Sequence, residues 1–132
     1  MITLEQLTFN LIRTFEGLKL AAYQDSVKVW TVGYGHTKDV TRTTVITLAE
    51  AYQFFEEDIQ PLAVLVKDRP MLEAASLISF GYNCGEAALK LLLTEPIEHL
   101  LLYNKAGNAV LTSLDTRRKL EYSLIVVSRG NA

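Results

Sequence analysis

The chain has 132 residues, of which 49% are hydrophobic and 21% charged, so it suffices for one compact domain and excludes wholesale disorder. Thirteen Lys and Arg stand against fifteen Asp and Glu, and a net charge of -2 provides no attraction to nucleic acid or to an anionic membrane. The single cysteine, Cys84, excludes an internal disulfide and has no Cys or His at metal-ligand spacing. We therefore expect no metal site and no cofactor.

The sequence also predicts neither a membrane segment nor a signal peptide. No apolar run approaches the roughly 18 residues of a spanning helix. The first fifteen residues are interrupted by Glu5, Gln6, Asn10 and Arg13, which the apolar core of a secretory signal does not tolerate. We expect a single domain over residues 1–132, with no integral membrane segment and no means of export of its own.

The N-terminal segment predicts a helix followed by a small sheet. Thr3 and Gln6 have the spacing of a capping box at the start of this helix, and Gly17 predicts a left-handed cap at its end. Residues 22–37 change to β-branched and aromatic side chains broken by glycine, which favours a small antiparallel sheet. The apolar residues of the helix recur at intervals of three and four: Leu4, Leu7, Leu11, Phe15 and Leu18.

Residues 47–84 predict two helices. Thr47 and Glu50 have the pattern of another capping box, and the helix that they open should be disturbed at Pro61. A nearly all-apolar helix from Pro70 to Cys84 should occupy the centre of the core, with Gly85 at its end.

Further helical segments are expected at residues 89–93, 96–103 and 115–127, with Ser113 or Asp115 as the cap of the last. One short sheet followed mainly by helices predicts an α+β fold.

Two carboxyl groups near the predicted sheet lie in unlike surroundings. Glu16 follows Phe15 on the edge of the buried helical face, where an apolar environment would favour the protonated acid. Asp25 lies in the polar turn Gln24-Asp25-Ser26, where it should stay ionised. Such a pair suits glycoside hydrolysis. Alternatively, Glu16 is a solvated residue and Asp25 a simple Asx turn, and spacing alone does not decide between these readings.

A longer motif contains both carboxyl groups. Asp25 follows Glu16 after eight intervening residues, Thr31 follows Asp25 after five, and the run Gly33-Tyr34-Gly35-His36 comes next. This pattern resembles, without a gap, the active-site signature of the phage-type lysozymes, the muramidase endolysins.

Three later segments are similar to segments of the same family. Asn83 holds the position at which the family has an Asn or Gln facing the substrate groove, and Arg117 and Arg118 match a basic pair in the final helix. Tyr103-Asn104-Lys105-Ala106-Gly107 is similar to the family's Trp-Asn-Lys-Ala-Gly segment. The resemblance covers the whole chain and implies a lysozyme-like α+β fold, in which a groove separates a small antiparallel β lobe from a mainly helical lobe.

The resemblance implies an inverting muramidase that hydrolyses the β-1,4 bond between N-acetylmuramic acid and N-acetylglucosamine in peptidoglycan. Glu16 would donate a proton to the glycosidic oxygen, while Asp25 and Thr31 would position a water on the opposite face of the sugar. Four further residues are expected to bind the substrate: Asn83, Tyr103, Asn104 and Tyr34.

The roles of three further polar residues, His36, Arg117 and Arg118, are also predicted. His36 is expected to be structural and to tie the sheet to a helix through a carboxylate. Either Arg117 or Arg118 could reach Glu16 across the groove floor, or Arg117 could pair on a solvated face with Glu121, four residues later.

The sequence departs from the family pattern in several places. Lys28 stands where a glycine is usual in the β-hairpin, at a cost of about 1 kcal/mol or more if φ is positive there. Thr112-Ser113 replaces a common Pro-Gly, and Tyr103 replaces a Trp. The stretches 59–71 and 85–103 are shorter than in typical members, so the helical lobe is trimmed and substrate affinity could fall.

Intact Glu16, Asp25 and Thr31 favour an active muramidase for bacterial cell lysis. We expect a monomer with peptidoglycan as its partner and no nucleic acid, held in the host bacterial cytoplasm until it is released to the periplasm or cell wall. One alternative is a catalytically weakened module of the same fold that binds peptidoglycan or a protein partner. Hydrolysis of chitin is a further alternative.

Overall fold

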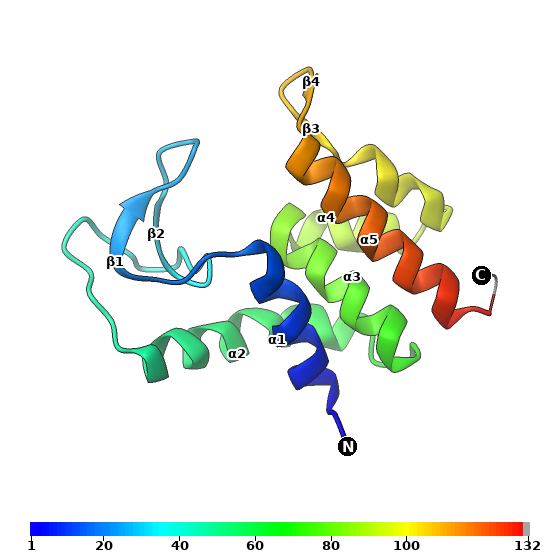
Figure 1. Cartoon of the computed structure of the whole chain (residues 1–132), viewed down its shortest axis with the longest axis horizontal. Coiled ribbons are helices and arrows are strands. Elements are labelled where there is room, and N and C mark those ends of the chain that lie inside the picture. The colour runs from blue at the N-terminus through cyan, green and yellow to red at the C-terminus, as the bar shows by residue number, and fades with distance from the viewer. Residues whose placement is uncertain (131–132) are drawn as a thin grey trace.

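The computed structural model describes residues 1–130, which form helices and two small antiparallel sheets (Figure 1). This arrangement confirms the predicted α+β class. In chain order the elements are α1 (Leu4–Phe15), β1 (Lys19–Gln24), β2 (Trp30–Gly33), α2 (Leu48–Leu65), α3 (Met71–Cys84), α4 (Glu86–Leu92), the 3-10 helix η1 (Ile97–Leu102), β3 (Lys105–Ala106), β4 (Ala109–Val110) and α5 (Thr112–Ser128).

Helix α1 begins as predicted and ends earlier than predicted. The Thr3 hydroxyl accepts from the Gln6 backbone N–H at 3.1 Å, and the Gln6 side chain accepts from the Thr3 N–H at 2.8 Å. The predicted left-handed cap at Gly17 is wrong, because the helix ends at Phe15 and Glu16 is already extended, with φ -96° and ψ 129°. Glu16 therefore lies at the junction between α1 and the first strand.

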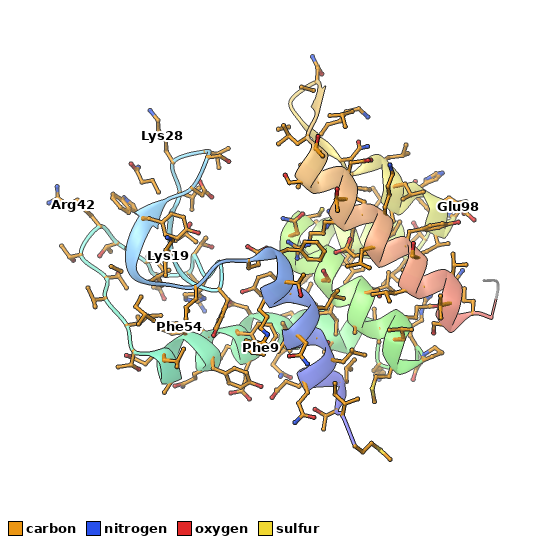
Figure 2. The ribbon with its side chains drawn as sticks, viewed as in Figure 1. Phe9, Lys19, Lys28, Arg42, Phe54 and Glu98 are labelled. Atoms are coloured by element: carbon orange, nitrogen blue, oxygen red, sulfur yellow. The ribbon has the colours of Figure 1, made fainter. Side chains whose placement is uncertain are left out.

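The predicted sheet within residues 22–37 forms from β1 and β2, although β1 begins earlier, at Lys19. The two strands pair antiparallel, and their register shifts between Lys19 and Tyr23. Lys28 lies in the hairpin that joins them, and its side chain points outward, away from the rest of the molecule (Figure 2). Its φ is 66°, a left-handed conformation that glycine adopts freely and that is unfavourable for lysine.

Helix α2 continues through its proline. Thr47 and Glu50 form the predicted capping box. The predicted disturbance at Pro61 does not end the helix, which runs on to Leu65. Ile59 and Leu62 lie on either side of the proline and are 3% and 5% exposed, so burial of both holds the helix together despite one missing backbone hydrogen bond.

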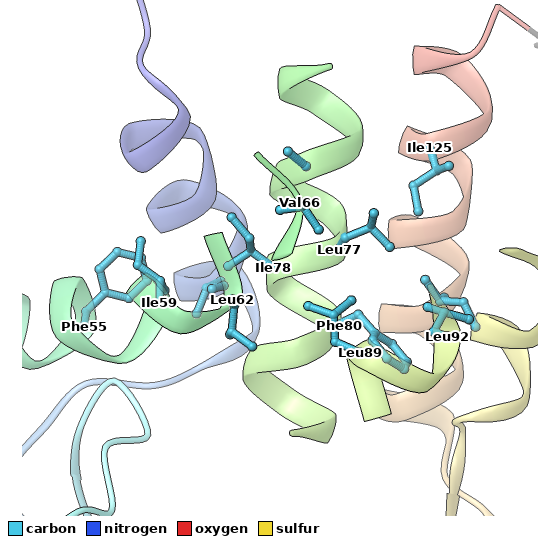
Figure 3. Close-up of a cluster of buried hydrophobic side chains, with 13 residues drawn as sticks. Phe55, Ile59, Leu62, Val66, Leu77, Ile78, Phe80, Leu89, Leu92 and Ile125 are labelled. Atoms are coloured by element: carbon cyan, nitrogen blue, oxygen red, sulfur yellow. The ribbon is translucent and has the colours of Figure 1, made fainter. Parts of the chain in front are cut away.

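Helix α3 lies at the centre of the core, as predicted. All its residues from 73 to 81 are buried, and it packs against α1, α2, α4 and α5. Gly85, with φ 102°, ends it. Figure 3 shows core side chains of α3 facing those of the neighbouring helices, and the residues labelled there are Phe55, Ile59, Leu62, Val66, Leu77, Ile78, Phe80, Leu89, Leu92 and Ile125.

The C-terminal segments keep the predicted helical character with different bounds. The segment predicted at residues 96–103 forms the 3-10 helix η1, Ile97–Leu102, and the last helix begins at Thr112. The predicted cap by Ser113 or Asp115 is wrong, because Leu111 occupies the N-cap position and the helix has no side-chain cap there. The hairpin of β3 and β4 was not predicted, since strands of two residues are too short to show an alternating pattern.

We define the β lobe as residues 19–47 and the helical lobe as residues 71–128. In Figure 1 the β1–β2 sheet lies on one side of the molecule and helices α3 to α5 on the other, while α2 runs between them. Within residues 1–130, no helix combines the length and the apolar character that crossing a membrane requires.

Candidate active site

A polar pocket of about 290 Å³ lies between the two lobes. It brings together Glu16 from the end of α1, Asp25 and Thr31 from the β hairpin, and Asn83 from the end of α3. Its full lining is Glu16, Tyr23, Asp25, Thr31, Gly35, Thr37, Tyr82 and Asn83. The three residues of the sequence motif thus meet in one hollow, although three different elements or turns carry them.

The carboxyl of Glu16 is held by a cation from the far end of the chain. Arg117 Nη1 donates to Glu16 Oε2 at 2.6 Å, and the two side chains are 4% and 23% exposed. The guanidinium also lies over the Phe15 ring, 4.9 Å from its centroid. The expected apolar environment of Glu16 is therefore wrong, because α5 supplies a charged partner that no pattern around residue 16 indicates.

The backbone of Gly35 approaches Glu16 from the β lobe. Its φ is +91°, and a Cβ at this position would lie 3.2 Å from Glu16 Oε1. Glycine is thus favoured by the left-handed backbone and by the carboxyl, which would have to move a few tenths of an ångström to admit a Cβ. The carboxyl of Glu16 lies between this backbone on one side and Arg117 on the other.

Tyr82 joins the end of α3 to the loop that carries Gly35. Its hydroxyl donates to the Tyr34 carbonyl at 2.5 Å. Burial raises the pKa of Tyr82, and the nearby carboxylates of Asp58 and Glu16 raise it further. The phenol therefore remains a proton donor and fixes the loop against the helix.

Asp25 organises the turn of the β hairpin and keeps one oxygen free. Its Oδ1 accepts from the backbone N–H groups of Val27 and Val29 at 2.9 and 2.8 Å, the contacts of an Asx turn. Its Oδ2 has no hydrogen-bond partner within residues 1–130. The Asx turn and the catalytic reading of Asp25 are thus compatible, because one oxygen shapes the turn while the other is available in the pocket.

Thr31 presents an acceptor to the same pocket. Its side chain lies on β2 and is 4% exposed, and its hydroxyl donates to the Val29 carbonyl at 2.9 Å. Because its one proton is used in this bond, the hydroxyl offers lone pairs alone to a third group. Such an oxygen can hold a water through one of the water's hydrogens.

Tyr23 also lines the pocket, and the sequence reasoning missed it. Burial raises the pKa of this phenol, and so do the carboxylates of Glu16 and Asp25, which lie near it. Tyr23 pairs with Thr31 across the two strands, and side chains of paired residues lie on the same face of a sheet. This register is set by the fold and has no signature in the local sequence.

His36 lies outside the pocket. Its Nδ1 is 2.7 Å from Asp58 Oδ2 on α2, and its ring stacks on Phe54 with centroids 4.2 Å apart. The expected link from the sheet to a helical carboxylate is therefore present, with Asp58 as the carboxylate.

Two aromatic residues expected to bind substrate do not line the pocket. The Tyr34 ring packs edge-on against Phe9, with centroids 5.1 Å apart. The Tyr103 ring packs edge-on against Phe80 at 4.8 Å and lines a separate hollow beside α4 and η1. A match between segments does not show which side of the chain faces a groove, and in both cases the ring faces the core.

The two asparagines are placed differently. Asn83 lines the pocket, as expected. Asn104 does not, because its Nδ2 donates to Asp115 Oδ1 at 3.0 Å and ties the segment before β3 to the first turn of α5. Nothing about the position of Asn104 along the chain indicates this partner.

The two arginines belong to one buried network. Arg117 contacts Glu16 and also places its Nε 3.4 Å from Glu121 Oε2, so both arrangements considered for it exist together. Arg118 does not reach Glu16 and pairs with Glu121 at 2.7 Å instead. Ser79 donates to Glu121 at 2.5 Å. The alternative of a solvated face for the Arg117–Glu121 pair is wrong, because the two side chains are 4% and 0% exposed.

Two smaller hollows adjoin the pocket. One of about 190 Å³ shares Glu16 and Asn83 with it and reaches the start of α5. The other, of about 210 Å³, shares Gly35, Thr37 and Tyr82. The three hollows form a groove with the carboxyl groups in its middle part. Among residues 1–130, no group of three or more His, Cys, Asp or Glu side chains is placed to hold a metal ion.

Known proteins are similar to this chain in sequence. The phage lysozyme family matches residues 13–121. The endolysin of Bacillus phage B103 is 32% identical over an alignment that covers 98% of this chain and 56% of that protein. The chain thus spans about half the length of the curated relatives that it matches.

Solved structures share the fold. The endolysin from Escherichia coli O157:H7 phage FAHEc1 has a TM-score of 0.79 and 25% identity, and the match covers 96% of this chain and 95% of that one. The muramidase domain of SpmX from Asticaccaulis excentricus has a TM-score of 0.75 and 24% identity, with 96% and 99% covered. These similarities confirm the lysozyme-like arrangement of a small β lobe and a helical lobe.

Proposed function

Because the chain belongs to the phage lysozyme family, we propose that it is a muramidase that hydrolyses the β-1,4 bond between N-acetylmuramic acid and N-acetylglucosamine in peptidoglycan. The observation that carries this proposal is the meeting of Glu16, Asp25 and Thr31 in one polar pocket between the lobes. The relatives that are named endolysins support peptidoglycan as the substrate. In this proposal residues 1–132 act as one catalytic domain and as a monomer, on the host cell wall once the protein has been released to it.

In the proposed reaction Glu16 is the general acid. Its proton passes to the glycosidic oxygen as the bond from that oxygen to the anomeric carbon breaks. Arg117 orients the carboxyl through the 2.6 Å contact, and Gly35 leaves room for it. Both neighbours position the acid and neither reacts.

A water completes the reaction from the opposite face of the sugar. Asp25 takes one proton of the water through Oδ2, and the Thr31 oxygen accepts a hydrogen bond from the other hydrogen. The water oxygen then bonds to the anomeric carbon opposite to the leaving group, which inverts the configuration there. The free Oδ2 and the committed hydroxyl proton of Thr31 support this assignment.

Replacing the acid tests the proposal. Glu16→Gln should lower the rate of wall lysis at least about 100-fold, because a general acid contributes about 10² to 10⁴ in rate. The amide keeps the volume of the side chain and can still accept from Arg117, so the melting temperature should change little. The assay is the loss of turbidity of permeabilised Gram-negative cells.

Glu98→Gln is the matched control, because Glu98 is an exposed carboxylate on η1. It should lyse cells at the parental rate. A Glu16→Gln protein that does so as well would show that Glu16 is not the acid. A parent chain that binds cell walls and never clears them would favour the alternative of a binding module with the lysozyme fold.

A further inference from the structure

A hollow of about 180 Å³ lies between the β lobe and the first half of α2. All its lining residues belong to the β lobe or to α2, and Lys38 alone is shared with the groove. The proposed hydrolysis uses none of these residues. We call this space the β-lobe hollow, and its full lining is Val32, His36, Lys38, Asp39, Val40, Thr44, Phe54 and Glu57.

His36 presents a free ring nitrogen to the β-lobe hollow. Its Nδ1 is held by Asp58 Oδ2 at 2.7 Å, and its ring stacks on Phe54, so the ring has a fixed orientation. Its Nε2 has no hydrogen-bond partner among residues 1–130 and keeps contact with solvent, although the side chain is only 6% exposed. Because the Asp58 carboxylate accepts the Nδ1 proton, the neutral ring offers the lone pair of Nε2 to a donor in the hollow.

The charges around the β-lobe hollow favour a cation. Asp39 and Glu57 are exposed, and neither carboxylate belongs to an ion pair among residues 1–130. Lys38 is exposed as well and forms no ion pair with either of them. Two carboxylates against one ammonium leave a net negative charge at the rim, which attracts a positively charged group.

The floor of the β-lobe hollow is hydrocarbon. Val32 is 0% exposed, and Val40 and Phe54 are half-buried. Figure 2 labels Phe54 on α2, where it packs against the apolar residues of the β lobe. A cavity of about 150 Å³ accommodates benzene, so a hollow of about 180 Å³ has room for a chain of about five carbons. A ligand that fits has a short aliphatic chain on this floor and a cationic head at the rim.

We propose that the β-lobe hollow binds a primary alkylammonium ion, with its N–H groups directed at His36 Nε2 and at the carboxylates of Asp39 and Glu57. An ammonium has three donors and no acceptor, so acceptors without partners suit it. The bound ion would connect the loop after β2 to α2 and stabilise the β lobe, since a ligand of the folded state alone favours that state. This site goes beyond the proposed function, because wall hydrolysis does not involve it.

Three probes with the same carbon chain separate charge from apolar contact: pentylamine, pentanoate and 1-pentanol. Each is titrated into the full chain at about pH 8, and the backbone amide shifts of Val40, Thr44 and Phe54 are followed by NMR. Pentylamine should move these amides to saturation, while the other two probes leave them in place. A stronger response to pentanoate would mean that the hollow selects an anion. An equal response to pentanol would reduce the site to apolar contact, and either result would overturn the proposal.

The double variant Asp39→Asn with Glu57→Gln removes both charges and keeps the size of both side chains. Asp39 has a φ of 59°, which asparagine tolerates, so the backbone should keep its conformation. The Kd of pentylamine should rise about two- to fivefold for each charge removed. The control pair Asp68→Asn with Glu98→Gln removes two exposed carboxylates outside the hollow and should keep the parental Kd. An unchanged Kd in the first double variant would contradict the site.

The nitrogen shift of His36 Nε2 gives a readout that attraction between charges does not produce. In the free parent it should be that of an unprotonated nitrogen, and it should move when pentylamine binds. A protonated Nε2 at the same pH would contradict its role as an acceptor. A lysine capped at both ends identifies the source of the ligand: binding as tight as that of pentylamine would assign the site to lysine side chains, and weaker binding would assign it to free amines.

Discussion

Glu16 owes its position to two residues that are distant in the sequence, Gly35 and Arg117. Arg117 is itself held by Glu121 and by the Ser79 carbonyl, which accepts from its Nη2 at 3.2 Å. Glu16, the proposed acid, is thus held by a guanidinium that is itself held, the condition under which a reacting group keeps a productive geometry.

Gly35→Ala should impair activity more than stability. The left-handed φ of +91° makes alanine unfavourable by about 1–2 kcal/mol, and the added Cβ would lie 3.2 Å from the reacting carboxyl. We expect the free energy of unfolding to fall by about that amount. The lysis rate should fall at least tenfold, because a misplacement of about 1 Å can cost on the order of 100-fold.

Gly107→Ala is the control for backbone strain alone. Gly107 also has a left-handed φ, +62°, but within residues 1–130 a Cβ added there would meet nothing within 4 Å apart from its two chain neighbours. Chemical denaturation should show a similar loss of stability, while lysis stays near the parental rate. Equal lysis by both variants would mean that Gly35 does not position Glu16.

The motif, through its resemblance to the family signature, was sufficient to predict that Glu16, Asp25 and Thr31 share one site. It was insufficient for Tyr34 and Tyr103, since only the packing of their rings against Phe9 and Phe80 shows that they face the core. The resemblance named Arg117 and Arg118 as candidates to reach Glu16, and only the fold, which joins positions 101 apart, shows that Arg117 is the one.

At the scale of the helices and strands, the starts of α1 and α2 were predicted correctly, whereas the breaks expected at Gly17 and Pro61 were not found. The capping boxes of α1 and α2 depend on side chains three residues apart, so local sequence contains all that forms them. The ends expected at Gly17 and Pro61 depend on packing with the rest of the molecule. At Pro61 the burial of its neighbours outweighs the loss of one hydrogen bond.

The hairpin between β1 and β2 offers a stabilising substitution. Lys28→Gly should raise the free energy of unfolding by about 0.5–1 kcal/mol, since relief of the left-handed strain outweighs the added flexibility of the unfolded chain. Urea denaturation measures this difference.

Lys19→Gly in β1 is the matched control, because Lys19 has no positive φ and a glycine inside a strand should destabilise the fold. A Lys28→Gly protein that is less stable than the parent would show that the hairpin is not strained at this position.

At the scale of the whole molecule, polar contacts join α5 to α3 at two places. Near the candidate active site Ser79 of α3 donates to Glu121 of α5, and its carbonyl accepts from Arg117. At the far end Glu73 of α3, 3% exposed, binds Arg129 just after α5 at 2.7 Å. The helix that carries Arg117 is therefore anchored along its length.

The ion pair of Glu73 with Arg129 predicts a pH dependence of stability. Burial of Glu73 opposes its ionisation, but hydrogen bonds from Arg129 and Arg69 outweigh burial and lower its pKa from the usual 4.5. A carboxyl whose pKa is lowered by folding stabilises the protein above its unfolded value and loses this effect as the pH falls through the folded value.

Glu73→Gln provides the comparison. The parent should exceed it in free energy of unfolding near neutral pH, and the difference should shrink between about pH 5 and pH 3. Denaturation at a series of pH values measures it. A difference that is constant or that grows as the pH falls would contradict the lowered pKa of Glu73.

The two lobes and the groove between them were predicted through the family resemblance, and the structure adds how the groove extends. Its charged end at Lys38, Asp58 and Glu86 could not be inferred from the sequence, because three elements bring these side chains together. Distant residues that meet through the fold have no signature in local spacing.

The configuration of the first product formed tests the proposed mechanism most directly. The parent is mixed with a short peptidoglycan oligosaccharide, and NMR follows the new reducing end before mutarotation equilibrates it. Attack by a water held at Asp25 and Thr31 on a β-linkage predicts that the α anomer appears first. If the β anomer appears first, the enzyme retains configuration through a second displacement, and the direct attack of that water is contradicted.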